Sequence, residues 1–254
     1  MEIFDTHAHY DDDAFESDRD IVLEKTLPES GVCGVVSAGI SVESSRANLE
    51  LAKKYDYIYF AAGIQPEETG KAKSDYLEKL TEILKSSKKA VAVGEIGLDY
   101  HWEIDRPTQK RFFEEQLQLA NTLNLPVIIH DREAHADTLE YVSRYKPKGT
   151  LHCFTGSAET AKEFVSLGLY IGFTGAVTFK NNKKAPKVIE SVPTERILVE
   201  TDCPYMAPEP LRGRRSDSSM IEHTIAFIAA IKGVTAEEMA HITAQNARRL
   251  FGLE

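Results

Sequence analysis

The segment EIFDTHAH, residues 2–9, joins an apolar stretch to two histidines that are separated by one residue. Ile3 and Phe4 favour a buried β-strand, and His7 and His9 fall at its carboxyl end. Because side chains alternate faces along a strand, both imidazoles point the same way, about 6 to 7 Å apart along it. The segment predicts a strand that delivers two metal-capable side chains to one end of a sheet.

Seven further apolar segments follow the first one along the 254-residue chain. They span residues 32–40, 57–66, 90–99, 126–131, 149–156, 169–177 and 197–204. Polar stretches with helical periodicity lie between them, as in residues 108–124, where Phe112, Leu119 and Leu123 recur on one face. Continuous apolar strands that alternate with helices are typical of a parallel sheet covered on both faces. Eight such repeats predict an α/β fold of the (β/α)8, or TIM-barrel, type.

An open doubly wound sheet is the alternative architecture, but the turn after the first strand carries no GxGxxG motif. The last helix opens with a capping box, Thr235 and Glu238, and stops near Gly252. No linker rich in Pro, Gly or Ser divides the sequence. We therefore expect one domain over residues 1–254.

The first residues carry no basic segment followed by an apolar run, and no apolar run approaches the roughly 18 to 20 residues that span a bilayer. Three cysteines without CxxC spacing favour a reducing compartment, so we expect a cytoplasmic protein with no membrane partner. Strand alternation turns Cys153 and Cys203 toward the helices. We expect both thiols, and Cys33, to be inert buried groups.

Metal-capable side chains recur near the carboxyl ends of the predicted strands, which form one rim of a barrel. They are His7, His9, Glu95, His130, His152 and Asp202. A single histidine at a strand end is more often a hydrogen-bonded structural residue than a ligand. Burying all six groups together without a cation would be costly, because unpaired charge is expensive away from water. The convergence therefore predicts a metal site.

Six ligands exceed the four of a tetrahedral zinc site and suit two divalent ions that share one carboxylate. Glu95, in the middle of its strand, is the candidate bridge, and such a pair of ions supports hydrolysis. Asp202 is both a candidate ligand and the candidate proton acceptor for the attacking water. Imidazole ligands favour Zn, Mn, Co or Ni over Mg, and the physiological ion stays open.

Seven segments resemble, in order and spacing, the motifs of the TatD family of metal-dependent deoxyribonucleases, which are amidohydrolase-type barrels. They are DTHAHYDDDAF (5–15), VGEIGLDYH (93–101), VIIHDRE (127–133), LHCFTGS (151–157), FTGAVTFKN (173–181), ILVETDCPYMAP (197–208) and NARRLF (246–251). The resemblance implies removal of nucleotides from DNA 3′ ends by phosphodiester hydrolysis. It also implies one ion on His7, His9, Glu95 and Asp202, and a second on Glu95, His130 and His152.

One loop departs from that family's pattern. After the third strand many members read GxHPH, whereas this chain reads GIQPEE over residues 63–68. Gln65 and Glu67 thus stand where histidines are common. Glu67 would repel a phosphate, so the departure bears on substrate specificity.

The formal charge of −10 excludes a broad basic face for nucleic acid. Positive charge gathers instead in the loops after the seventh and eighth strands, where Lys180 and Arg212 are the candidate phosphate ligands. Tyr100, His101 and Trp102, just after Glu95, are candidates for stacking on a base or sugar. These residues could equally be solvated loop charges or cover a helix end. The expected partner is DNA, as a single strand or a 3′ end, with metal-dependent affinity.

Two other functions stay open at this point. The same rim could serve an amide or ester hydrolase, including one that deacylates D-aminoacyl-tRNA, because fold does not decide chemistry. A metal-storing protein without turnover would need closed coordination, which a potential base such as Asp202 argues against. Hydrolysis that a chelator abolishes reversibly is expected of the deoxyribonuclease and of the amide or ester hydrolase, but not of a metal-storing protein.

Overall fold

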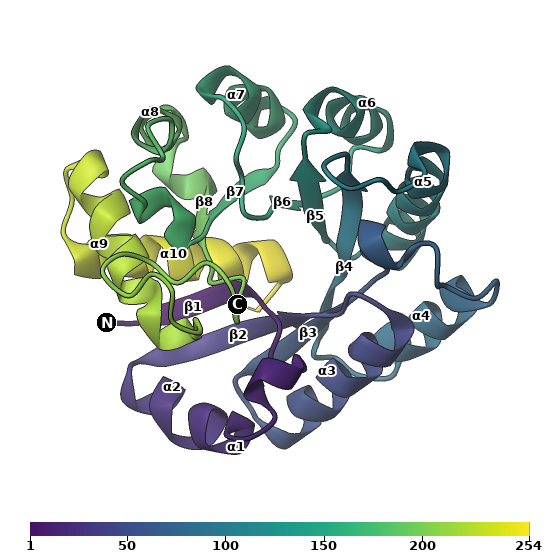
Figure 1. Ribbon diagram of the computed structural model, residues 1–254, viewed down its shortest axis with the longest axis horizontal. Coiled ribbons are helices and arrows are strands. Elements are labelled where there is room, and N and C mark those ends of the chain that lie inside the picture. Colours follow the sequence, from purple (N-terminus) through teal and green to yellow (C-terminus); the bar gives the residue numbers. More distant parts are fainter. Residues whose placement is uncertain (254) are drawn as a thin grey trace.

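In the computed structural model, which describes residues 1–253, eight parallel strands form one sheet in chain order. The strands are β1 (Ile3–Ala8), β2 (Val32–Ala38), β3 (Ile58–Ala62), β4 (Ala90–Asp99), β5 (Val127–Arg132), β6 (Gly149–Leu151), β7 (Tyr170–Phe173) and β8 (Ile197–Val199). Figure 1 shows them around a central axis with helices outside. The predicted (β/α)8 barrel is confirmed.

Helices follow the strands along the chain and pack around the barrel. They are α1 (Arg19–Ile21), α2 (Leu27–Glu29), α3 (Val42–Lys54), α4 (Tyr76–Lys85), α5 (Arg106–Leu123), α6 (His135–Tyr145), α7 (Ala158–Ser166), α8 (Ala185–Ser191), α9 (Ile221–Lys232) and α10 (Ala236–Phe251). Of these, α9 and α10 come after the last strand. The predicted helix 108–124 corresponds to α5, which ends where Asn124 adopts a left-handed conformation. Within residues 1–253 no helix is both long and apolar enough to cross a membrane.

The first and last strands meet just beyond the end of β8. The amide of Asp202 donates to the carbonyl of His7 at 2.9 Å, and the amide of His9 donates to the carbonyl of Cys203 at 2.9 Å. These bonds join the two ends of the sheet at the carboxyl rim. Three of the predicted metal ligands therefore sit at the point where the barrel closes.

Helix α10 covers the other end of the barrel. One apolar cluster combines side chains from seven strands with Ala244, Ala247 and Phe251 of α10. Because seven strands contribute to one cluster, their side chains in it face the barrel interior. Figure 1 shows α10 crossing behind β1 and β8, and α10 contacts both strands. The amino-terminal end of the barrel is thus a packed core, which leaves the carboxyl rim for chemistry.

Four strands end well before the residue that the sequence predicts. The predicted strands 57–66, 149–156, 169–177 and 197–204 end at Ala62, Leu151, Phe173 and Val199. Cys153 and Asp202 have φ angles of 45° and 57°, in the left-handed region that a strand cannot contain. His152 and Asp202 accordingly lie in turns beyond their strands, and such backbone conformations are common at functional sites.

Asn246 of α10 ties that helix to the start of β8. Its Nδ2 donates to the carbonyls of Thr194 at 2.8 Å and Ile197 at 2.9 Å, and the residue is buried. Asn246→Ala should lower the free energy of unfolding by about 1 to 3 kcal/mol, because it leaves buried carbonyls without donors. Denaturant unfolding measures the change. Gln245→Ala, on the exposed neighbouring residue, should change it by less than about 0.5 kcal/mol, and equal losses in both variants would contradict this role.

Candidate active site

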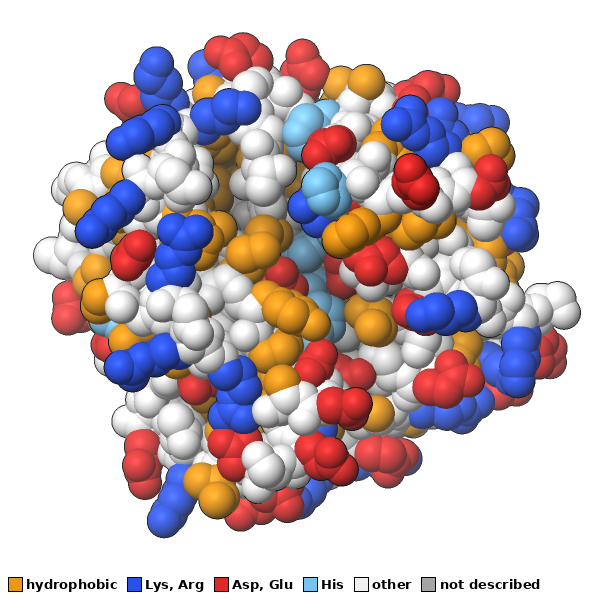
Figure 2. All heavy atoms as spheres, viewed as in Figure 1, with side chains coloured by type: hydrophobic (Ala, Val, Ile, Leu, Met, Phe, Trp, Pro, Cys, Tyr) orange, Lys and Arg blue, Asp and Glu red, His pale blue; other side chains and the backbone are white. Residues whose placement is uncertain are grey.

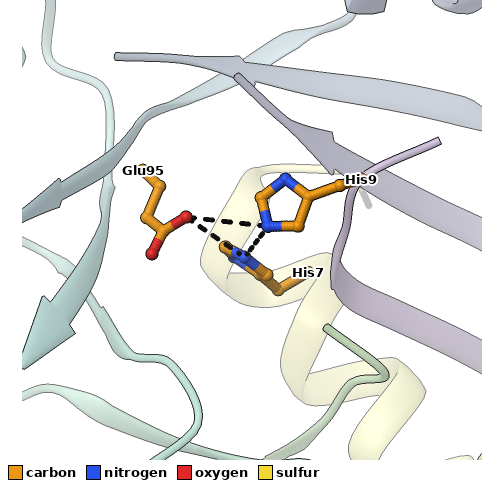
Figure 3. Close-up of side chains that lie close together, drawn as sticks. All are labelled: His7, His9 and Glu95. Atoms are coloured by element: carbon orange, nitrogen blue, oxygen red, sulfur yellow. Dashed lines mark hydrogen bonds and ion pairs between the residues drawn. The ribbon is translucent and has the colours of Figure 1, made fainter. Parts of the chain in front are cut away.

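The paired histidines meet a carboxylate from the far side of the barrel. His7 Nε2 and His9 Nε2 lie 3.0 Å apart, and each is 3.6 Å from Glu95 Oε2. Figure 3 shows the two imidazoles from the end of β1 and Glu95 from β4 pointing toward one another. The prediction that His7 and His9 face the same way is confirmed. Asp202 completes this group, with Oδ1 at 3.5 Å from His7 Nε2 and 3.4 Å from His9 Nε2.

A second group forms around the other oxygen of Glu95. Its Oε1 lies 2.8 Å from His130 Nδ1 and 3.0 Å from His152 Nε2, and these two nitrogens are 3.1 Å apart. All six predicted ligands therefore converge, although they come from five separate segments of the chain. Two of the three overlapping sets that could hold an ion share Glu95.

Outer partners fix which ring nitrogen faces the cluster. The carbonyl of Ala38 accepts a hydrogen bond from His9 Nδ1 at 3.0 Å, and Asp99 Oδ2 accepts one from His130 Nε2 at 2.8 Å. When either ring is neutral, the opposite nitrogen presents a lone pair to the centre of the cluster. This arrangement is typical of histidine metal ligands. The donor set thus fits bound cations.

The cluster also contains a carboxylate oxygen that receives no hydrogen bond from the described residues. Glu95 is almost fully buried, and its Oε2 has no hydrogen-bond partner among the described residues. A buried carboxylate oxygen without a donor or a cation is strongly destabilising. Divalent ions shared by the six groups would compensate the charge of Glu95 and Asp202 and satisfy this oxygen.

Burial and charge together set the protonation of the cluster. Burial lowers the pKa of His7 to about 4. It opposes protonation of His9 and His130 as well, but hydrogen bonds to Asp202 and to Asp99 outweigh it and raise their pKa to about 9 and about 10. Burial works against ionisation of Glu95, yet the neighbouring imidazoles hold its pKa well below the usual range. Without cations, the cluster thus contains protonated imidazoles at neutral pH.

Three carboxylates that the sequence reasoning did not single out support these residues. Asp99 holds His130, as described above. Glu200 is fully buried, lies 3.7 Å from His152 Nδ1 and accepts the amide of Cys153 at 2.5 Å, and burial raises its pKa to about 7. Asp5 accepts hydrogen bonds from Thr201 and Ser218, both at 2.6 Å. Acidic residues inside otherwise apolar strands were the signal that could have indicated them.

The cluster lies at the floor of a cleft of about 680 Å³. Figure 2 shows histidine side chains at the bottom of a hollow in the centre of this face, with acidic side chains along its lower side. Asp11, Asp12, Glu67 and Glu68 line the cleft, while Arg132 is its one lysine or arginine among the described residues. Gln65, from the loop that departs from the family pattern, also lines it. The cleft wall is therefore acidic rather than basic.

Of the residues predicted to contact substrate, Trp102 lines this cleft, whereas Arg212, Lys180, His101 and Tyr100 do not within the part of the chain that the structure describes. Arg212 is exposed and lies over the ring of Phe179, 4.2 Å from its centroid. Lys180 is exposed. His101 Nδ1 contacts Glu133 Oε1 at 3.1 Å. Proximity in sequence to a rim strand did not determine where these side chains point.

The expectation for Cys153 was wrong in its placement. Cys153 lies in a turn and not in a strand, so the alternation of side chains along a strand does not apply to it. Its side chain lines the cleft. Burial, together with the nearby charge of Asp202, raises the pKa of its thiol well above the usual range. The thiol is therefore protonated at neutral pH, in line with the expected inertness. Cys203 is buried as predicted.

Comparison with known proteins identifies the family. A family model described as TatD related DNase matches residues 4–252. The chain belongs to the TatD family. It is 40% identical to the uncharacterized metal-dependent hydrolase YabD of Bacillus subtilis, over 98% of each chain. It is 33% identical to a protein of Erwinia tasmaniensis named 3′-5′ ssDNA/RNA exonuclease TatD, over 99% of this chain and all of that one.

A solved structure agrees with this assignment. The crystal structure of YjjV, a TatD homolog from Escherichia coli, matches with a TM-score of 0.94 at 31% identity, over 99% of this chain and 98% of that one. Membership in the TatD family, together with the cluster of histidines and carboxylates, makes this protein a metal-dependent hydrolase. The resemblance read from the seven motifs is confirmed.

Cation binding to this TatD-family protein should release protons. His9 and His130 hold protons at pH 7 in the absence of metal, and a cation needs both rings neutral. The apparent affinity for Zn²⁺ should therefore rise as the pH increases from 6 toward 9, with at least two protons released per protein at pH 7, because the pKa of His152 is raised as well. Calorimetric titration in two buffers of different ionisation enthalpy measures this release, and equal heats in both buffers would show that it does not occur.

Proposed function

We propose that this protein is a two-metal phosphodiesterase that removes nucleotides from the 3′ ends of single-stranded DNA. The observation that carries the proposal is the sharing of Glu95 between two groups of ligands at the floor of an open cleft. A shared carboxylate suits two neighbouring divalent ions, and such pairs serve displacement at phosphorus. The Erwinia relative is named an exonuclease for single-stranded DNA and RNA, which supports this class of substrate.

In this proposal each residue has a defined task. His7, His9, Glu95 and Asp202 hold one ion, and Glu95, His130 and His152 hold the other. Bound divalent ions would supply Lewis acidity, which activates water at neutral pH and neutralises charge on the phosphoryl group.

Asp202 is the proposed proton acceptor. Its pKa lies below the usual range, because hydrogen bonds from His7 and His9 outweigh its burial, so it is ionised at neutral pH. Its side chain is 15% exposed, the largest exposure of the carboxylates in the cluster, and faces the cleft. It therefore combines access to water with the charge that a general base needs.

Amide or ester hydrolysis, including D-aminoacyl-tRNA deacylation, is the competing chemistry on the same rim. The leaving group separates the two. A phosphodiesterase should hydrolyse bis(nitrophenyl) phosphate and be inhibited competitively by inorganic phosphate. An amidase or esterase should do neither, and should hydrolyse nitrophenyl acetate instead.

Removing either central carboxylate should abolish turnover while the fold survives. Glu95→Ala removes the shared ligand and Asp202→Ala the proposed base, so each should lower kcat on a 3′-labelled single-stranded oligonucleotide by more than about 100-fold. A chelator should do the same to the wild type. Product release on a sequencing gel measures activity, and circular dichroism checks the fold. Glu163→Ala, on the exposed face of α7, is the matched control. Full activity of Glu95→Ala would remove the shared-ligand role.

Neutralising the acidic wall should strengthen substrate binding. Glu67 is exposed and lines the cleft, so its charge repels a phosphate backbone over the range that salt leaves unscreened. Glu67→Gln should lower KM for a single-stranded oligonucleotide about two- to fivefold at low ionic strength, with the gain shrinking as salt is added. Glu237→Gln, an equal charge change on exposed α10, should leave KM unchanged. An unchanged KM in the Glu67 variant would show that this wall does not face the bound strand.

A further inference from the structure

The mouth of the cleft concentrates exposed hydrophobic surface. Five large hydrophobic side chains are exposed among residues 1–253, and three of them, Trp102, Tyr205 and Met206, line this one cleft. They are 48%, 57% and 38% exposed, respectively. Large apolar groups left in water around a polar cleft mark a contact surface. Their concentration at the site indicates a flat apolar part of the substrate.

The two aromatic rings belong to opposite sides of the barrel. Trp102 follows β4 and Tyr205 follows β8, and β4 and β8 are four strands apart in an eight-stranded order. Both nevertheless line the same cleft. The cleft above the metal-ligand cluster is therefore bordered by one ring from each of two opposite strands.

Of three neighbouring aromatic or imidazole groups after β4, only Trp102 lines the cleft. Tyr100 donates to Asp137 Oδ2, and Arg106 covers its ring at 4.1 Å. His101 contacts Glu133, as described above. Trp102 thus remains available to substrate, and the guanidinium of Arg132 lies 5.7 Å from its ring centroid, also in the cleft.

Tyr205 is held in position from two directions. Its amide donates to the carbonyl of Asp202 at 2.9 Å, which ties the ring to the turn of the proposed base. Its hydroxyl lies 3.5 Å from Asp12 Oδ2 across the cleft wall. The ring is therefore held beside the reaction centre while more than half of its surface stays open.

We propose that Trp102 and Tyr205 form a clamp for one unpaired nucleobase at the 3′ end, and that this clamp makes single strands the preferred substrate. The proposal rests on the proposed function and names its specificity-determining residues. Every nucleobase offers a π face, so stacking holds any sequence. A base inside a duplex is already stacked and paired, and it must first be extruded to reach the rings. The acidic cleft supplies little backbone attraction, which leaves stacking as the main source of discrimination.

Trp102 is the only tryptophan in the chain, so its fluorescence reports the clamp directly. The experiment titrates Zn²⁺-loaded protein with a deoxyadenosine decamer whose 3′ linkages are phosphorothioates, which slows turnover. Saturable quenching is expected with the single strand, and none with a blunt duplex of the same length. Tyr205→Ala should raise Kd for the decamer by about 5- to 150-fold, whereas Tyr205→Phe, which keeps the ring and loses only the long contact of its hydroxyl with Asp12, should raise it much less.

Kinetics give a second readout. Trp102→Ala should lower kcat/KM on single-stranded DNA by about 5- to 150-fold, with Trp102→Phe much less affected. The loss should be smaller on an oligonucleotide whose 3′ nucleotide lacks a base. Duplex and single strand should become more nearly equal substrates in the alanine variant.

The outcomes separate this inference from the proposed function. Hydrolysis of oligonucleotides by the wild type with unchanged tryptophan fluorescence, or with full activity in both alanine variants, overturns the clamp and leaves the nuclease standing. Equal quenching by the duplex also overturns the clamp. Failure of the wild type to bind or hydrolyse any oligonucleotide overturns both.

Discussion

The site depends on the burial of one carboxylate among four imidazoles. Glu95 is almost fully buried, with Oε1 against His130 and His152 and Oε2 near His7 and His9. Water cannot solvate this charge, and no group among residues 1–253 donates a hydrogen bond to Oε2. The backbone hydrogen bonds that close the barrel hold the ends of β1 and β8 in place around it. The free-energy cost of burying the Glu95 charge favours bound cations. The hydrogen bonds on the outer nitrogens of the imidazoles favour them as well, because they orient the opposite nitrogens toward the centre of the cluster.

Sequence patterns predicted those parts of the molecule that follow from periodicity. Eight apolar segments indicated the barrel, and the spacing of His7 and His9 placed both rings on one face of β1. The same alternation failed for Cys153, because the chain leaves β6 at Leu151 and adopts a left-handed conformation. Where a strand ends is decided by tertiary contacts, such as the amide of Cys153 donating to Glu200, which lies 47 residues away. No local pattern contains that information.

Surface charge was predicted less well than the buried cluster, for a physical reason. A buried polar group needs partners, so its type and strand position constrain where it lies, whereas a long cationic side chain on a loop has many acceptable positions. Arg212 lies over Phe179, and Arg215 makes two hydrogen bonds of 2.7 Å to Asp18. Neither contact is visible as a spacing in the sequence. The basic loops after β7 and β8 therefore indicated positive charge near the rim, but not positive charge in the cleft.

The acidic cleft has a consequence for how metal and substrate depend on each other. Without cations, Asp12, Glu67 and the cluster carboxylates repel a phosphate backbone, and Arg132 is the one lysine or arginine lining the cleft among the described residues. Bound divalent ions reverse the sign of the field where a phosphate would sit, since they are the largest local charges. Affinity for a polyanion then arises mainly at the metal centre and stays low elsewhere on the surface. Under the proposed function, this arrangement in a protein of net charge −10 would confine a nucleic acid to one short contact, which would suit the end of a strand better than its interior.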